Sequence, residues 1–381
     1  MINRLQLKRA LLLLLFVSAA FAGLGYRLVD LQVLRHDELA RLAQDNTQRE
    51  FWQSPRRGDI LDTHGNILAS SVPVKTICAD PSLIGNQQMV VANALAPLLQ
   101  MSEADLYPKL FVHISKDAKG QWMTNNLHYV RLQRNIPDET WQKIQDTMSH
   151  LNFGMDEKTL SKADRQFFNN LRSSAIFAEP DEMRVYPNGA LAAQVLGFSS
   201  VQDIKADDHN FSQIIGRDGI ELALNSRLSG VAGWRVTDTD RAQHELVALR
   251  DEDVHPRDGL NVVLTIDSVI QNILETSLAK ALKEHTPRSI TGIVIRPSTG
   301  EILAMATLPN YDPNQPNTIS PDTRDRCITD VMEPGSTFKI VVVSGALNEG
   351  IVHLDDPFYC EQGHFAFAGR ILHDHEPFGT L

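Results

Sequence analysis

Ser336 and Lys339 are two side chains whose types and spacing could perform nucleophilic catalysis. A serine hydroxyl becomes a good nucleophile only when a neighbouring base takes its proton. Residues three apart lie on one face of a helix, so the amine comes within reach of the hydroxyl. A lysine can serve as that base only if burial lowers its pKa. We therefore predict a nucleophilic Ser336 with Lys339 buried beside it.

The residues around Ser336 mark it as a candidate nucleophile more specifically than its spacing from Lys339 does. Pro334-Gly335 ends the preceding segment, and an apolar helical run follows over residues 340–347. This pattern predicts a helix that begins at the serine, where backbone amides create a positive field. The same spacing recurs at Ser277 without a preceding turn. We interpret that second copy as a coincidence on a helix surface.

The elements before Ser336 predict the opening of an α+β domain. Residues 261–266 are rich in β-branched side chains and predict a strand. Asp267 follows as the cap of a helix with an apolar stripe from 270 to 282. Two further strands are predicted at 291–295 and 301–307, and they would form an antiparallel hairpin.

The N-terminus predicts a membrane anchor. Residues 10–29 form an apolar run that is long enough to span the hydrocarbon layer. Three basic residues precede it: Arg4, Lys8 and Arg9. Positive charge keeps that side in the cytoplasm, so residues 1–9 would be a cytoplasmic tail. A cleaved signal peptide is the alternative, because a small-x-small motif begins at Ala20. The apolar run continues past that motif, so we favour an uncleaved anchor.

The segment between the anchor and residue 255 predicts a separate α+β domain. A polar helix is expected from Asp30 to about Arg49, before Pro55. Apolar pairs on either side of Gly65 then predict a hairpin, which explains Arg57-Gly58-Asp59 better than a cell-adhesion tripeptide does. Helices are expected over two further stretches: residues 90–100 and 137–148. A turn-rich linker at 256–259 ends this domain.

Bulk composition excludes several classes of function. The chain has 381 residues and a formal net charge of −11, which argues against general nucleic-acid binding. Three cysteines are too few for a disulfide scaffold and form no zinc pattern. His373, Asp374 and His375 lie together in a loop-like segment, which we interpret as solvated surface. We therefore expect no metal and no cofactor.

Motifs spread along nearly the whole sequence resemble those of the class B penicillin-binding proteins. The most specific is Glu333-Pro334-Gly335-Ser336-Thr337-x-Lys339. Other matching stretches are residues 57–69, 72–81, 186–198, 219–230, 264–267, 299–305 and 326–330. The stretch 72–81 is similar to the division-specific (FtsI-type) branch in particular. The resemblance implies a periplasmic pedestal over 30–255 and part of a transpeptidase domain over 256–381.

The resemblance also implies a reaction and a set of partners. Ser336 would attack the penultimate D-alanine carbonyl of a peptidoglycan stem peptide and form an acyl-enzyme, and β-lactams would acylate the same serine. The protein would span the inner membrane once and contact membrane-embedded division proteins such as a glycan polymerase. It would cross-link septal peptidoglycan during cell division.

This sequence departs from the family in one respect. Family members carry an SxN loop and a KTG-type strand, and this sequence contains neither motif. We therefore expect a C-terminally truncated domain with an incomplete antiparallel sheet, weak packing and no catalysis by this chain alone. A non-catalytic scaffold protein of the division machinery is the main alternative. An elongation-specific penicillin-binding protein is a less favoured one, and a β-lactamase or β-lactam sensor is the least favoured.

Overall fold

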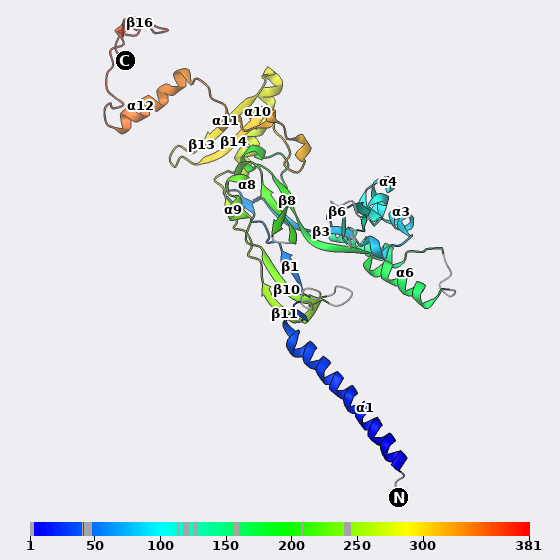
Figure 1. Cartoon of the computed structure of the whole chain (residues 1–381). Coiled ribbons are helices and arrows are strands. Elements are labelled where there is room, and N and C mark those ends of the chain that lie inside the picture. Colours follow the sequence, from blue (N-terminus) through cyan, green and yellow to red (C-terminus); the bar gives the residue numbers. More distant parts are fainter. Residues whose placement is uncertain are drawn as a thin grey trace. The chain divides into compact units, whose positions relative to one another are not determined.

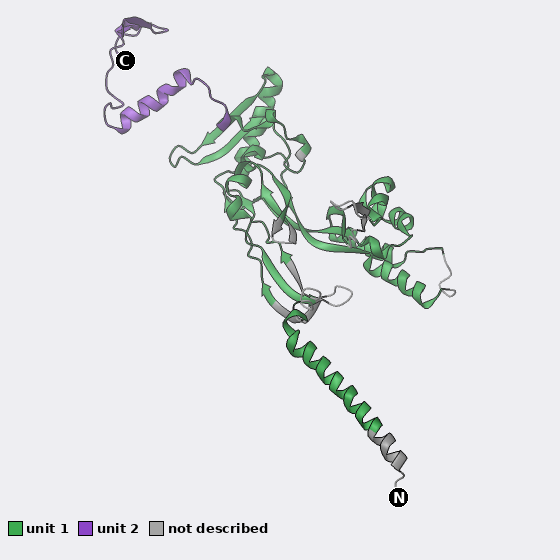
Figure 2. Cartoon of the chain, in the orientation of Figure 1, with its two compact units in different colours: residues 1–327 green, residues 328–381 purple. Residues whose placement is uncertain are grey.

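The structure is a computed structural model that describes residues 4–39, 41, 48–112, 114–116, 122–124, 129–154, 160–206, 209–239 and 245–381. Figure 1 shows the whole chain, coloured along the sequence. It divides into two compact units, residues 1–327 (unit 1) and residues 328–381 (unit 2), which Figure 2 shows in different colours. The elements are mixed helices and strands, as the α+β prediction requires.

The N-terminal run forms α1 (Arg4–Val29), followed by a π-helical turn, η1 (Asp30–Leu34). Within the described residues, one helix is long and apolar enough to cross a membrane, over Leu12–Leu34 with a mean hydropathy of 1.9. This helix fits a single-pass anchor. Of the polar helix predicted from Asp30 to about Arg49, residues 40 and 42–47 lie outside the described residues. Gln48 and Arg49 belong instead to β1 (Gln48–Gln53), which pairs antiparallel with β10 (Gly233–Thr239).

The strand β3 (Ile67–Ala79) organises the pedestal region. It pairs antiparallel with β7 (Ile176–Val185) along ten residue positions, and with β6 (Val130–Ile136) over its second half. Its first half pairs with β2 (Ile60–Leu61). The hairpin prediction is confirmed, since Gly65 in this turn has φ of +83°.

Helices pack against one end of this sheet and form the larger apolar core. They are α3 (Gln88–Leu99), α4 (Glu103–Leu106), η3 (Tyr107–Leu110), α5 (Asp138–Ser149) and α6 (Lys162–Ser174). The predicted helices at 90–100 and 137–148 are therefore confirmed. Ile77, Leu95, Ile144 and Leu171 are fully buried in this core. Short strands β4 (Ile114–Lys116) and β5 (Trp122–Thr124) pair with each other.

A second apolar core joins the other end of the sheet to short helices. Its members include Ile60, Leu68, Tyr186, Leu196 and Leu228. The elements around it are α7 (Ala193–Leu196), β8 (Ser199–Ala206), β9 (His209–Gly216), α8 (Gly219–Ala223) and α9 (Asn225–Leu228). The strand β11 (Glu245–Val254) completes the sheet of β1 and β10.

The strand predicted at 261–266 is confirmed only as the two-residue β12 (Val262–Val263). It pairs parallel with β2, so it extends the pedestal sheet. Beyond it, Asp267 caps α10 (Ser268–His285) by accepting hydrogen bonds from the backbone N–H groups of Val269 and Ile270. The predicted hairpin is confirmed as β13 (Ile290–Ile295) and β14 (Ile302–Leu308). Gly292 of β13 allows close packing, since a Cβ there would lie 2.7 Å from Leu274 of α10.

Unit 2 contains few elements. They are the 3₁₀ turn η6 (Gly335–Phe338), α12 (Lys339–Asn348), η7 (Glu361–Gly363), β15 (His364–Phe367) and β16 (Arg370–His373). The short α11 (Arg326–Thr329) bridges the two units in sequence. Most side chains of unit 2 are exposed, including the large apolar ones of α12. This agrees with the prediction of weak packing near the C-terminus.

Candidate functional site

Ser336 follows Gly335 in the 3₁₀ turn η6, and this turn leads directly into α12. Gly335 has φ of +55°, a conformation that glycine adopts at no steric cost. The backbone N–H of Lys339 donates to the carbonyl of Ser336. Residues three apart in a 3₁₀ turn are nearly eclipsed, so the serine and the lysine project from the same side. The predicted helix start at Ser336 is thus present as a 3₁₀ turn that leads into α12.

The predicted burial of Lys339 is not found. Ser336 and Lys339 are both exposed, and neither side chain makes a hydrogen bond or ion pair with another described residue. The apolar residues that follow are exposed as well, with Ile340 at 73% and Val342 at 59%. A helix that is apolar all round is normally buried in a core. In the described part of this chain no element covers α12, so the lysine keeps its contact with solvent.

The second serine–lysine copy has no catalytic arrangement. Ser277 lies in the middle of α10 and donates its hydroxyl hydrogen to the carbonyl of Ile273, 2.8 Å away. This back-bond to the preceding turn is ordinary for a helical serine. Lys280 is exposed. The interpretation of this copy as a surface coincidence agrees with these contacts.

Unit 1 holds a buried polar network that the sequence did not single out. The guanidinium of Arg57 lies 2.6 Å from the carboxylate of Glu221, and that of Arg184 lies 2.7 Å from it. Glu221 is 0% exposed and Arg57 is 2% exposed. Arg57 is therefore not available to an adhesion receptor. The burial of Arg57 leaves no local signal in the sequence, since its partner Glu221 lies 164 residues away.

Four further polar contacts attach the elements that precede Ser336 to the pedestal. The carboxylate of Asp62 accepts a hydrogen bond from the Ser268 hydroxyl at 2.7 Å. Glu275 of α10 accepts from the backbone N–H of Ala192, and burial raises the pKa of Glu275. The remaining two contacts are from Gln194 to the carbonyl of Thr307, and between Asn314 and the backbone of Tyr186. These contacts fix α10 and β14 against the pedestal.

The cysteines and the C-terminal histidines show no cluster of three metal ligands. Within the described residues, no group of three or more His, Cys, Asp or Glu side chains is suited to hold a metal ion. Cys78, Cys327 and Cys360 are all free, and burial raises the pKa of Cys78 to about 12. His373, Asp374 and His375 are exposed.

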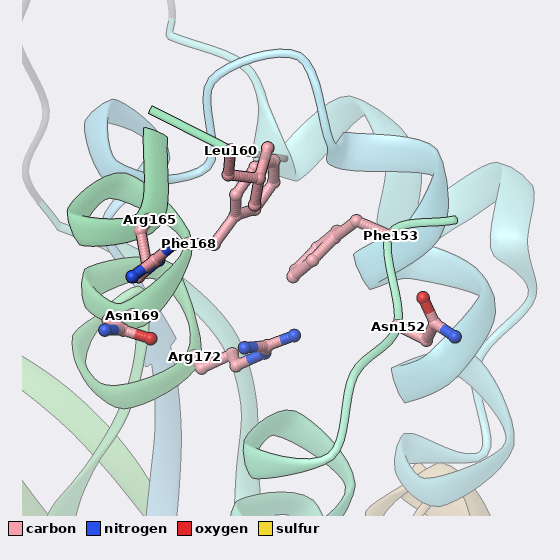
Figure 3. Close-up of a pocket in the computed structure, with 7 residues that line it drawn as sticks. All are labelled: Asn152, Phe153, Leu160, Arg165, Phe168, Asn169 and Arg172. Carbon is pink, nitrogen blue, oxygen red and sulfur yellow. The ribbon is translucent and has the colours of Figure 1, made fainter. Parts of the chain in front are cut away.

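Figure 3 shows a small pocket between α6 and the segment that follows α5. The guanidinium of Arg172 lies 5.4 Å from the ring centre of Phe153 and donates two hydrogen bonds to the carbonyl of Leu151. Phe168 packs against the same ring, with 4.7 Å between centroids. The described lining holds no carboxylate, histidine, serine or cysteine. The pocket therefore lacks groups for acid, base or nucleophilic chemistry.

Two family models match this sequence. The Penicillin-binding Protein dimerisation domain matches residues 53–264, and the Penicillin binding protein transpeptidase domain matches residues 290–379. The second match contains Ser336 and Lys339. Together the two matches cover both the pedestal sheet and the elements around the candidate serine.

Curated relatives are similar along most of this chain. Stage V sporulation protein D of Bacillus subtilis (strain 168) is 29% identical over 96% of this chain and 50% of its own length. Peptidoglycan D,D-transpeptidase FtsI of Escherichia coli (strain K12) is 31% identical over 88% of this chain and 50% of its own length. The chain spans about half the length of the curated relatives it matches.

Solved structures share the fold at low identity. Penicillin Binding Protein 2X from Streptococcus thermophilus has a TM-score of 0.56 at 21% identity, over 86% of this chain and 45% of that one. The Penicillin-Binding Protein (PBP2) in its complex with MreC from Helicobacter pylori has a TM-score of 0.56 at 20% identity, over 88% of this chain and 59% of that one. These likenesses concern the fold alone.

Proposed function

Because this chain belongs to the class B penicillin-binding proteins, with a dimerisation domain and a transpeptidase domain, we propose that it serves septal peptidoglycan cross-linking as a D,D-transpeptidase of cell division. The observation that carries the proposal is the position of Ser336 and Lys339 on one side of the turn that opens α12, inside the segment matched by the transpeptidase domain. Several relatives of this chain are named peptidoglycan D,D-transpeptidase FtsI.

In the proposed reaction, the hydroxyl oxygen of Ser336 attacks the carbonyl carbon of the penultimate D-alanine in a stem peptide. Lys339 takes the hydroxyl proton and passes it to the amide nitrogen, so the C–N bond breaks and the terminal D-alanine leaves with a free amine. An amine of a neighbouring strand then attacks the acyl-enzyme and releases the serine. Such a covalent intermediate divides one difficult step into two easier ones. β-Lactams would acylate Ser336 in the first half of this sequence and remain attached.

We also propose that this chain alone does not catalyse the reaction. A general base must be held within hydrogen-bond reach of its proton, in surroundings that tune it. Lys339 is instead exposed, and the apolar side chains of α12 have no cover among the described residues. The sequence also lacks the SxN and KTG motifs of the family. Activity therefore requires further residues that cover α12 and complete the site.

The proposed location is the inner membrane, with α1 as a single-pass anchor, residues 1–9 in the cytoplasm and the rest in the periplasm. The basic residues before the apolar run support this orientation. A membrane-embedded glycan polymerase is the proposed partner of the anchor. A scaffold role without catalysis in the division machinery is the second candidate, supported by the exposure of Ser336 and Lys339.

Covalent labelling with a fluorescent penicillin tests the proposal. The chain is purified in detergent and incubated with the probe, next to a Ser336→Ala variant and a Ser277→Ala control. We expect very slow labelling of the chain, its complete loss in Ser336→Ala and no effect of Ser277→Ala. Label that survives in Ser336→Ala would rule out this serine as the nucleophile. Rapid labelling of the unmodified chain would contradict its proposed inactivity.

The division role is tested separately by location in cells. A fluorescent fusion to the chain is expected to gather at the division site, and a uniform distribution along the cell envelope would favour the elongation-specific alternative. The scaffold candidate predicts the same location without any label at Ser336. The two measurements therefore separate the enzyme from the scaffold.

A further inference from the structure

Two histidines of unit 2 face each other across a short hairpin. In the antiparallel pair of β15 and β16, His364 lies directly opposite His373. Their Nδ1 atoms are 2.8 Å apart, and their rings meet edge to face with centroids 4.9 Å apart. Both residues are exposed. The two nitrogen atoms therefore lie close together at a position that solvent can reach.

The hairpin holds this pair by its own backbone. Its two loop residues, Ala368 and Gly369, both have positive φ, of 49° and 77°. Two positive φ values are the signature of a type I′ turn, whose twist matches the strands and fixes their register. On the opposite face, Phe365 stacks on Phe367. Side chains alternate between faces of a strand, so the histidine face stays separate from this aromatic face.

We propose that His364 and His373 form a two-histidine site for a divalent transition-metal ion, with Cu²⁺ as the best-fitting ion. Imidazole nitrogen suits copper, zinc and nickel, and Cu²⁺ binds most tightly among the divalent ions of that series. Two nitrogens each about 2.0 Å from a metal are about 2.8 Å apart at a right angle, but about 3.3 Å apart at a tetrahedral angle. The 2.8 Å between the Nδ1 atoms is the length of the hydrogen bond that joins them, and it places both nitrogens within reach of one metal ion.

The hydrogen bond between the rings has to be replaced when the metal binds. Without metal, one Nδ1 donates its N–H to the lone pair of the other Nδ1. A metal ion requires a free lone pair on both nitrogens. The donor ring shifts to the tautomer with its proton on Nε2, so no net proton is released from the neutral pair. Because the described residues offer no group of three ligands, water completes the coordination. The protein therefore contributes two ligands to the metal ion, the imidazole nitrogens of His364 and His373, and the hairpin holds both in position before the ion binds.

Copper titration of the purified full chain in detergent tests this site. Cu²⁺ is supplied as its glycine complex, so that glycine competes with weak binding by the other histidines among the 13 of the chain. Variants His364→Ala and His373→Ala remove the site, and His375→Ala is the matched control because this exposed histidine lies two residues from His373. Circular dichroism verifies that each variant keeps its secondary structure.

We expect one Cu²⁺ per chain, with an electron paramagnetic resonance spectrum of two equatorial nitrogen ligands. Each of His364→Ala and His373→Ala should weaken binding by at least about tenfold, while His375→Ala leaves it unchanged. Binding that is equal in all four proteins would be adventitious only and would overturn the proposal. Loss of copper binding in His375→Ala would also overturn the proposal. So would the absence of any copper binding by the unmodified chain in the presence of glycine. This test does not use penicillin labelling, so its result does not depend on the proposed transpeptidase activity.

Discussion

Arg57 and Glu221 form a buried ion pair in unit 1, with the guanidinium 2.6 Å from the carboxylate although 164 residues separate them in sequence. Arg184 binds the other oxygen of the same carboxylate at 2.7 Å, and the Tyr186 hydroxyl also donates to it. One carboxylate thus binds two guanidinium groups and offsets one of their two positive charges, where the segment before β2, the end of β7 and α8 converge.

Replacement of Glu221 by Gln should destabilise unit 1 strongly. The substitution keeps the volume but leaves two buried cations without their counter-charge. Removing one member of a buried pair costs about 3–5 kcal/mol. The measurement is the midpoint of urea unfolding of the purified chain, monitored by tryptophan fluorescence. Glu38→Gln is the control, because its ion pair with Arg35 is solvent-exposed and should shift the midpoint little. Equal midpoints for Glu221→Gln and the unmodified chain would refute the structural role of this network.

Asp62 should make the stability of the chain depend on pH. Burial by itself would raise the pKa of Asp62, but hydrogen bonds from Asn66, Ser268 and the backbone of His64 outweigh it and hold the pKa far below its usual range. A depressed carboxyl pKa contributes stability above the unfolded-state value of about 3.9, and this contribution is lost as the pH falls below it.

We therefore expect the melting temperature to drop between about pH 5 and about pH 2, and to drop less in Asp62→Asn. The exposed Asp355 provides the control, since Asp355→Asn should keep the full dependence on pH. Melting curves recorded by circular dichroism at several pH values give the comparison. If Asp62→Asn and the unmodified chain show the same dependence on pH, Asp62 does not carry it.

The side chain of Gln194 should stabilise the contact between the pedestal and β14. Its amide donates to the carbonyl of Thr307 at 2.9 Å, and the side chain is buried. Gln194→Ala leaves that carbonyl without this donor, which costs about 1–3 kcal/mol when the group stays buried. Hydrogen exchange should rise in β13 and β14, as measured by mass spectrometry. Gln142→Ala changes an exposed glutamine of α5 and should leave exchange in these strands unaltered.

Two isoleucines should respond differently to the same truncation. Ile144 is fully buried in the larger core, whereas Ile340 at the start of α12 is 73% exposed. Ile144→Ala should cost about 2–5 kcal/mol of stability, because burial is lost and a cavity remains. Ile340→Ala removes no burial in this chain and should leave the urea midpoint unchanged. A comparable loss in both variants would mean that α12 is covered in solution.

The sequence predicted the elements whose signals are local. The Gly65 hairpin, the helices at 90–100 and 137–148, the Asp267 cap and the hairpin before Ser336 are all present. Each depends on residues within a few positions: turn chemistry, a cap, or apolar side chains at one period. The family resemblance has the same origin, because the motif around Ser336 occupies a few consecutive residues.

Only the tertiary structure decided the features that depend on distant partners. Gln48–Gln53 forms a strand because β10 supplies its hydrogen bonds from nearly two hundred residues away. Arg57 is buried because Glu221 neutralises it, and Lys339 is exposed because no described element covers α12. The pairing of His364 with His373 follows from strand register. Pairing and burial are properties of two segments at once, and a local pattern describes only one of them.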